Sequence, residues 1–244
     1  MKQSSTRQNR IISSVTICVL LVLWQVAAMW IGRDLILPSP LETMQEIIRL
    51  VQTLAFYQSM LATIVRTVVG FLISFAASII LGSLSYRFTY VEAMLKPVVT
   101  VLRSVPTLAV ILLALLWIDR DIVPLFIGFL ILFPMIYQNV LTGAKETSHK
   151  LLEMAKVYHI SKINVIRKIY LPSMKPYLKA SALAGISLNI KVIIAAEVMS
   201  VPKYGIGARM VIEKINYNTV GLFAWALVTV TIALALNMIV EKVK

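Results

Sequence analysis

The sequence predicts an all-α membrane protein with about six transmembrane helices and one helical loop on the cytoplasmic side. Two numbers and one pattern lead to this fold class. Of the 244 residues, 59% are hydrophobic and only 14% are charged, and the apolar residues are gathered in long runs. A soluble domain is about 45–50% apolar and about 25% charged. The apolar excess is too large for one water-soluble core, so a lipid bilayer is the expected solvent.

Six runs are long enough to span a bilayer, which takes about 20 mostly apolar residues. They cover residues 11–31, 62–84, 98–118, 122–142, 178–200 and 216–240. The first run follows a basic segment, as in a signal peptide. However, its uncharged stretch from Ile11 to Gly32 is 22 residues long, whereas a signal core has about 7–15. We therefore expect an uncleaved span.

The basic residues set the expected orientation. With a cytoplasmic N-terminus, 14 of the 24 Lys and Arg residues fall in cytoplasmic segments and 6 in external ones. The positive-inside rule then places both termini in the cytoplasm. In a soluble protein the net charge of +13 would suggest a nucleic acid. Here the charges lie between apolar runs, so lipid is the expected partner and nucleic acid is not.

Neither catalytic chemistry nor a metal site is expected from the residue inventory. The single cysteine, Cys18, cannot form an intramolecular disulfide. The two histidines have no acidic cluster nearby, so they indicate no metal site. The spans hold no convergent set of Ser, His and acidic residues of the kind a membrane enzyme needs. The chain also lacks a GxxxxGK[ST] phosphate loop, so any ATP and Mg must bind another chain.

Two domains are expected. Residues 1–58 would hold the first span and an external helix, and residues 59–244 would form the core. Leu37–Pro38–Ser39–Pro40 is expected to be extended, because each proline restricts its own φ and the backbone of its predecessor. The apolar residues between Leu41 and Leu54 then recur at helical spacing. We expect this helix to lie at the outer membrane interface.

The loop at about 143–177 is the most informative segment. It is about 35 residues long and holds seven Lys or Arg residues. Its apolar residues fall on two helical faces, one with Leu152, Ala155 and His159, the other with Ile163, Ile166 and Ile169. Ser161 is placed to cap the second helix, and Leu171–Pro172 is expected to end it.

Two short helices joined by a tight corner would form a rigid surface for a soluble partner. The alternative is an amphipathic loop that lies on the lipid headgroups.

This loop resembles the signature of permeases in binding-protein-dependent ABC importers. That signature has Glu-Ala-Ala, three residues, Gly, nine residues, Ile, one residue and Pro. Here Glu153-Met154-Ala155 stands for the first part, Ile169 falls at the expected spacing, and Pro172 stands for the proline, one position beyond it. His159 stands where glycine is usual, and histidine adopts a positive φ less readily than glycine does.

The resemblance extends over about 60–243 and is closest to the nitrate, sulfonate and taurine permeases. Four groups of residues carry it in one order: Leu61–Arg66 with Gly70-Phe71; Lys96-Pro97 and Leu102–Pro106 through to Trp117; Phe133–Met135 with Asn139 and Gly143; and Ala195–Met199 with Gly205–Gly207.

The resemblance implies a type I ABC importer permease fold in the bacterial inner membrane. It implies a non-catalytic subunit that pairs with a second copy, two cytoplasmic ATP-binding subunits and an extracytoplasmic solute-binding protein. The ATPase contact would include Leu151, Leu152, Glu153, Ala155, His159, Ile160 and Pro172. A sulfonate or nitrate is the expected type of solute. A thiamine-pyrimidine or other vitamin precursor remains an alternative, and a secondary transporter is the alternative from another class.

Charges inside the spans suggest where solute passes. A charge at mid-span costs about 2.5–3.5 kcal/mol on insertion scales, so it usually has a partner or a cavity. Lys191 is the deepest, and with Asn189 and Glu197 it forms the predicted translocation pathway. Pairing with a neighbouring helix or reaching to an interface is the alternative for Lys191, and a structural hydrogen bond within the dimer is the alternative for Glu197. For Arg66 and Arg103, such an interface position or a salt bridge is expected.

Overall fold

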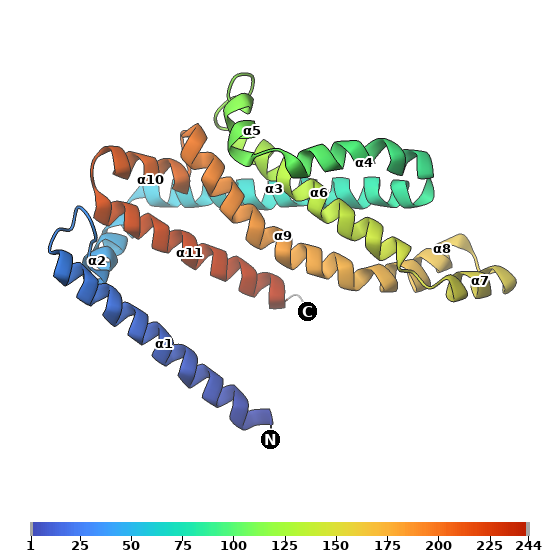
Figure 1. Ribbon diagram of the computed structural model, residues 1–244, viewed down its shortest axis with the longest axis horizontal. Coiled ribbons are helices and arrows are strands. Elements are labelled where there is room, and N and C mark those ends of the chain that lie inside the picture. Colours follow the sequence, from blue (N-terminus) through green and yellow to red (C-terminus); the bar gives the residue numbers. More distant parts are fainter. Residues whose placement is uncertain (1, 243–244) are drawn as a thin grey trace. The chain divides into compact units, whose positions relative to one another are not determined.

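The computed structural model describes residues 2–242, which are folded as helices and short connections (Figure 1). In chain order the helices are α1 (Lys2–Ile31), α2 (Pro40–Val51), α3 (Leu54–Arg87), α4 (Thr89–Ser104), α5 (Thr107–Ala114), α6 (Val123–Lys145), α7 (His149–Val157), α8 (Lys162–Val165), the π-helical turn η1 (Ile166–Tyr170), α9 (Leu171–Ser200), α10 (Ile206–Ile215) and α11 (Thr219–Lys242).

Four of these helical stretches are long and apolar enough to cross a bilayer, within the part of the chain that the structure describes. They are Leu54–Arg87, Val123–Lys145, Lys162–Ser200 and Thr219–Ile239. The pair α4 and α5 makes a fifth if it is counted as one broken span, and Val15–Ile31 is a shorter apolar helix. The predicted all-α membrane fold is confirmed.

The third predicted span is not the continuous helix expected at 98–118. It breaks after Ser104, and α4 and α5 meet at an angle of 98°. Val105 and Pro106 are both extended, with ψ of 131° and 123°. Proline disfavours helical geometry in its predecessor and has no N–H to continue the hydrogen-bond ladder. The chain therefore turns at this dipeptide in spite of its apolar composition.

The chain divides into two compact units, the first made of Met1–Gln58 and Arg209–Val230. The predicted external helix forms there as α2. It begins with a capping box, in which the Ser39 side chain accepts from the Glu42 N–H and the Glu42 carboxylate accepts from Ser39. The Trp24 Nε1–H donates to the Pro38 carbonyl at 3.0 Å, which joins α1 to the turn before α2.

The second unit comprises Ser59–Ala208 and Thr231–Lys244. Its core forms where α6 packs along α9. Leu132, Ile136 and Val140 of α6 are fully buried in one apolar cluster. Small residues allow the close approach: a Cβ added to Gly128 would lie 2.7 Å from Asn189 Oδ1, and one added to Gly143 would lie 2.9 Å from the Tyr177 ring. The candidate sites lie on these two helices and on the segment that connects them.

Candidate functional site

The predicted corner of the 143–177 loop forms at the end of α7. The His159 N–H donates to the Lys156 carbonyl at 3.1 Å, and the Ile160 N–H donates to the Ala155 carbonyl at 2.9 Å. These two bonds and the left-handed φ of 49° at His159 make a Schellman motif. Histidine thus adopts the geometry that glycine usually supplies at this position.

The second helix of the loop does not end at Pro172, which corrects the sequence prediction. Helix α8 continues through η1 into α9, so helical backbone runs from Lys162 to Ser200. The Leu171 N–H donates to the Ile166 carbonyl, five residues back. This wider turn closes just before Pro172, which then lies in the first turn of α9, where its missing N–H costs little. Ser161 precedes α8, but its side chain makes no capping hydrogen bond.

All the predicted ATPase-contact residues except Pro172 lie on α7 and at its corner, between the end of α6 and the start of α9 (Figure 1). Ala155 is buried, and Leu152 is partly buried. Most of the other residues are exposed. They are Leu151, Glu153, His159, Ile160 and Pro172, together with the apolar neighbours Met154, Val157 and Tyr158. The predicted residues of α7 and its corner therefore form a surface with exposed apolar side chains, whereas Pro172 lies apart in the first turn of α9.

The three predicted pathway residues have different surroundings. Lys191 is exposed and has no ion-pair partner among the described residues. Asn189 is fully buried, and its Nδ2 donates to the Thr67 carbonyl at 2.6 Å. Residues two apart on a helix do not share a face, so Asn189 packs against α3 and α6 while Lys191 points elsewhere. Their membership of a common pathway stays a prediction.

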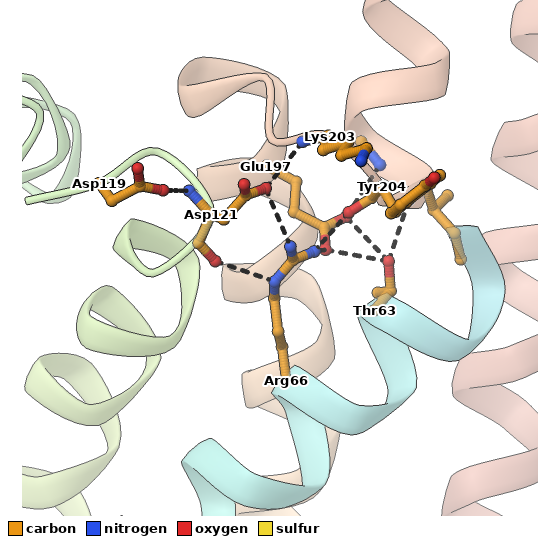
Figure 2. A network of polar contacts seen from close by, with 9 residues as sticks. Thr63, Arg66, Asp119, Asp121, Glu197, Lys203 and Tyr204 are labelled. Atoms are coloured by element: carbon orange, nitrogen blue, oxygen red, sulfur yellow. Dashed lines mark hydrogen bonds and ion pairs between the residues drawn. The ribbon is translucent and has the colours of Figure 1, made fainter. Parts of the chain in front are cut away.

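Glu197 is fully buried in a polar network near the end of α9 (Figure 2). Arg66 of α3 donates from Nη1 to Glu197 Oε1 at 2.8 Å and to the Tyr204 carbonyl at 2.6 Å. The Thr63 hydroxyl lies 2.9 and 3.0 Å from the two Glu197 carboxylate oxygens. The Gly207 N–H donates to Oε2 at 3.0 Å. Every charge in this pair is compensated inside one subunit.

The same network reaches the connection between α5 and α6. Arg66 Nε donates to the Asp121 carbonyl at 3.2 Å, and Arg66 Nη2 lies 3.6 Å from the Asp121 carboxylate. That carboxylate also accepts from the Lys203 N–H at 2.7 Å. Figure 2 shows these groups converging on the Arg66 guanidinium. One arginine thus joins α3, the Asp121 connection, α9 and the turn before α10.

The network explains why Gly205 and Gly207 follow Glu197 in the sequence. A Cβ on Gly205 would lie 2.7 Å from Glu197 Cδ, and one on Gly207 would lie 2.5 Å from the Ile194 carbonyl oxygen. Only glycine lets α10 approach the buried carboxylate this closely. Sequence reasoning allowed a salt bridge for Arg66 but did not find its partner, because 131 residues separate Arg66 from Glu197.

Residues 74–243 match the family described as "Binding-protein-dependent transport system inner membrane component". The chain belongs to this family. It is accordingly an ABC transporter permease with several membrane-crossing helices, as the sequence resemblance indicated.

Curated relatives carry several transport names. The chain is 28% identical over 204 residues to "Nitrate import permease protein NrtB" of Synechocystis sp., covering 80% of this chain and 73% of that protein. It is 29% identical over 188 residues to "Putative aliphatic sulfonates transport permease protein SsuC" of Bacillus subtilis, covering 74% and 66%. It is 26% identical over 159 residues to "Formylaminopyrimidine transport permease protein ThiX" of Halalkalibacterium halodurans, covering 65% and 63%.

A solved structure shares the fold. A chain of the MetNI methionine ABC transporter in an inward facing conformation superposes with a TM-score of 0.66 at 15% identity. The match covers 78% of this chain and 94% of that chain. The predicted type I importer permease fold is confirmed by this likeness, which at such low identity concerns the fold alone.

Proposed function

We propose that two copies of this permease form the translocation pathway of an importer driven by two cytoplasmic ATP-binding subunits. An extracytoplasmic solute-binding protein delivers the solute, and both termini face the cytoplasm. The ATP-binding subunits dock on the α7 surface of the 143–177 loop. ATP and Mg bind those subunits, so this chain supplies the pathway and the mechanical coupling.

The observation that carries the proposal is the projecting surface around α7. Leu151, Met154, Val157, Tyr158 and Ile160 are all exposed there. They lie within a loop that is rich in Lys and Arg, which the positive-inside rule assigns to the cytoplasm. Apolar side chains in water favour burial by about 25 cal/mol per Å² of surface. A soluble partner that covers this surface is therefore favoured.

The continuous helix after the corner supports mechanical coupling. Backbone hydrogen bonding runs from Lys162 through η1 into α9 without a hinge loop. The Tyr86 and Tyr170 hydroxyls are 3.1 Å apart, so the turn η1 is also tied to α3. Packed helices move as units. A displacement of the α7 corner would accordingly move α9, whose other end carries Glu197.

A pull-down with matched charge reversals tests the docking surface. The chain is tagged, solubilised and purified with its native ATPase as wild type, as Glu153→Lys and as Glu146→Lys. Glu153 is exposed on α7, and Glu146 is exposed just after α6. The ATPase is expected to bind the wild type and Glu146→Lys, and to be lost from Glu153→Lys. Equal ATPase binding to all three proteins would show that the α7 surface is not the contact. If the ATPase binds none of them, the importer function is contradicted.

A small anion is the solute that we propose. Two relatives are named for nitrate and for aliphatic sulfonates, and the exposed Lys191 supplies a cation within a span. The relative named for formylaminopyrimidine favours a vitamin precursor as the second candidate. ATP-dependent uptake of labelled nitrate, an alkanesulfonate and a neutral aminopyrimidine by the reconstituted complex separates the two.

A further inference from the structure

A cavity of about 390 Å³ lies where the broken span meets α6, and no role has been assigned to it so far. It is bounded by the end of α4, the start of α5, one face of α6, and Leu188 of α9. Sites for small ligands typically have volumes of about 300–1,000 Å³. Most of the lining is apolar, and four side chains bring polar groups to it, namely Arg103, Thr107, Gln138 and Asn139.

Arg103 carries an uncompensated charge at this cavity. It has no acidic partner among the described residues, and none of the described residues that line the cavity is acidic. Two other cations of the same unit are paired. Arg66 is paired with Glu197, and Lys145 of α6 lies 2.5 Å from Glu92 of α4. An unpaired cation within a membrane-spanning region usually has a functional partner. The sequence-based alternatives for Arg103, a salt bridge or an interface position, leave the polar lining unexplained.

The lining matches the chemistry of an oxyanion. A guanidinium presents parallel N–H donors that fit two oxygens of a carboxylate, sulfonate or nitrate group. The Gln138 and Asn139 amides and the Thr107 hydroxyl can donate further hydrogen bonds. With no acidic side chain in the lining, a cationic solute would meet only repulsion from Arg103. The apolar remainder of the wall suits a small organic substituent.

The position of the cavity suits a step along a pathway. A second cavity of about 410 Å³ shares Arg103 and Gln138 with the first and extends along α4 and α6 to Lys96 and Lys145. On the other side, the half-buried Leu188 lines the first cavity, and the exposed Lys191 follows three residues later on α9. Three residues of helix rise about 4.5 Å. The two cavities therefore meet at Arg103 and Gln138, and the first one reaches α9.

We propose that Arg103, with Gln138 and Asn139, forms an oxyanion-binding site in the translocation pathway. This inference rests on the proposed import function and assigns the part of the pathway that recognises the anionic group. The same chemistry would hold the phosphate of a lipid headgroup. Arg103 and Gln138 are exposed and Asn139 is half-buried, so the cavity is open to a ligand from outside the chain. The solute is the occupant that we infer, because the cavity adjoins a second one that extends along α4 and α6.

The test measures protection of an introduced thiol in the complete transporter. Cys18, the single native cysteine, is exposed and is first replaced by serine. Met135→Cys then places a thiol in the cavity wall without removing a proposed ligand, and Leu188→Cys is a second reporter in case the first fails to assemble. The rate of labelling by N-ethylmaleimide is measured in maltoside micelles, which contain no phosphate. Methanesulfonate and nitrate are added as probes, and uncharged dimethyl sulfone is the control.

The proposal expects both anions to slow labelling and dimethyl sulfone to have no effect. Arg103→Gln should raise the half-protecting anion concentration by roughly tenfold, the order expected for one charge-assisted hydrogen bond. Lys96→Gln removes a cation that lines only the neighbouring cavity, and it should leave protection nearly unchanged. Protection that is insensitive to Arg103→Gln, or that appears only when phospholipid is added, would overturn the solute site. The labelling needs no ATP. Loss of anion protection therefore tests the anion site, whereas loss of ATP-driven uptake tests the proposed import function.

Discussion

Removing Arg66 is expected to destabilise the permease far more than removing an exposed arginine. In Arg66→Met the buried Glu197 carboxylate loses its 2.8 Å ion pair, and the Tyr204 and Asp121 carbonyls lose a donor. Breaking a buried pair by removing one partner costs about 3–5 kcal/mol. Thr63 and Gly207 still donate to the carboxylate. We therefore expect the lower part of that range, about 3 kcal/mol, which is more than a hundredfold in the unfolding equilibrium.

The assay is denaturant unfolding of the purified chain in mixed micelles, with Arg49→Met as the matched control. The Arg49 side chain is 78% exposed and pairs with Glu46 at 3.7 Å, so its loss should cost less than about 1 kcal/mol. Adding Glu197→Gln to Arg66→Met removes the stranded charge, keeps a carbonyl acceptor and should recover about 1 kcal/mol or more. If Arg66→Met costs no more than Arg49→Met, the network does not stabilise the fold as argued.

Three further predictions concern a buried glycine, the corner at the end of α7 and the cap of α2. Gly207→Ala puts a Cβ 2.5 Å from the Ile194 carbonyl oxygen and should cost about 1–3 kcal/mol in the same assay, whereas Gly70→Ala, with its nearest contact at 3.5 Å, should cost less. His159→Gly relieves a positive φ and should raise the melting temperature of the purified chain; a lower melting temperature would contradict the left-handed corner. The Ser39 N–H and hydroxyl hold the pKa of Glu42 below its ordinary value of 4.5. That stabilisation is present above pH 4.5 and is lost as the pH falls through the lowered pKa. The protection of the α2 amides, measured as their exchange rate relative to that of an unstructured peptide at the same pH, should therefore fall in acid. Ser39→Ala should lower this protection by about fivefold at neutral pH and remove most of the acid effect.

Composition and periodicity predicted most of the helices, because long apolar runs have no other stable form in a bilayer. They failed where backbone geometry overrides composition. The run at 98–118 is mostly apolar, yet Val105-Pro106 breaks it. Proline restricts the backbone of its predecessor, but Pro97, Pro134 and Pro176 lie inside helices, so the sequence marked Pro106 as only one of several possible breaks.

Pro172 shows the opposite error. Proline in a helix interior usually ends or kinks the helix, and the sequence prediction followed that rule. The π-helical bond from the Leu171 N–H to the Ile166 carbonyl lets the helix continue. No pattern in the sequence distinguishes this wider turn from a helix end.

The sequence located a candidate site only where the residues of that site lie close together in the chain. The α7 surface is contiguous in sequence, so one motif and one helical period located it. The Arg66–Glu197 pair and the Arg103 cavity join residues from helices that are far apart in sequence. A hydropathy pattern gives no information on which faces of two spans meet, so these arrangements required the structure.

ATP-driven uptake in proteoliposomes is the measurement that tests the importer function most directly. The permease is reconstituted with its native ATPase and solute-binding protein, and uptake of labelled solute is followed with ATP, without ATP, and with the ATPase omitted. We expect uptake only when ATP and the ATPase are both present. Uptake that continues without the ATPase, driven by an ion gradient, would contradict the importer function and indicate a secondary transporter.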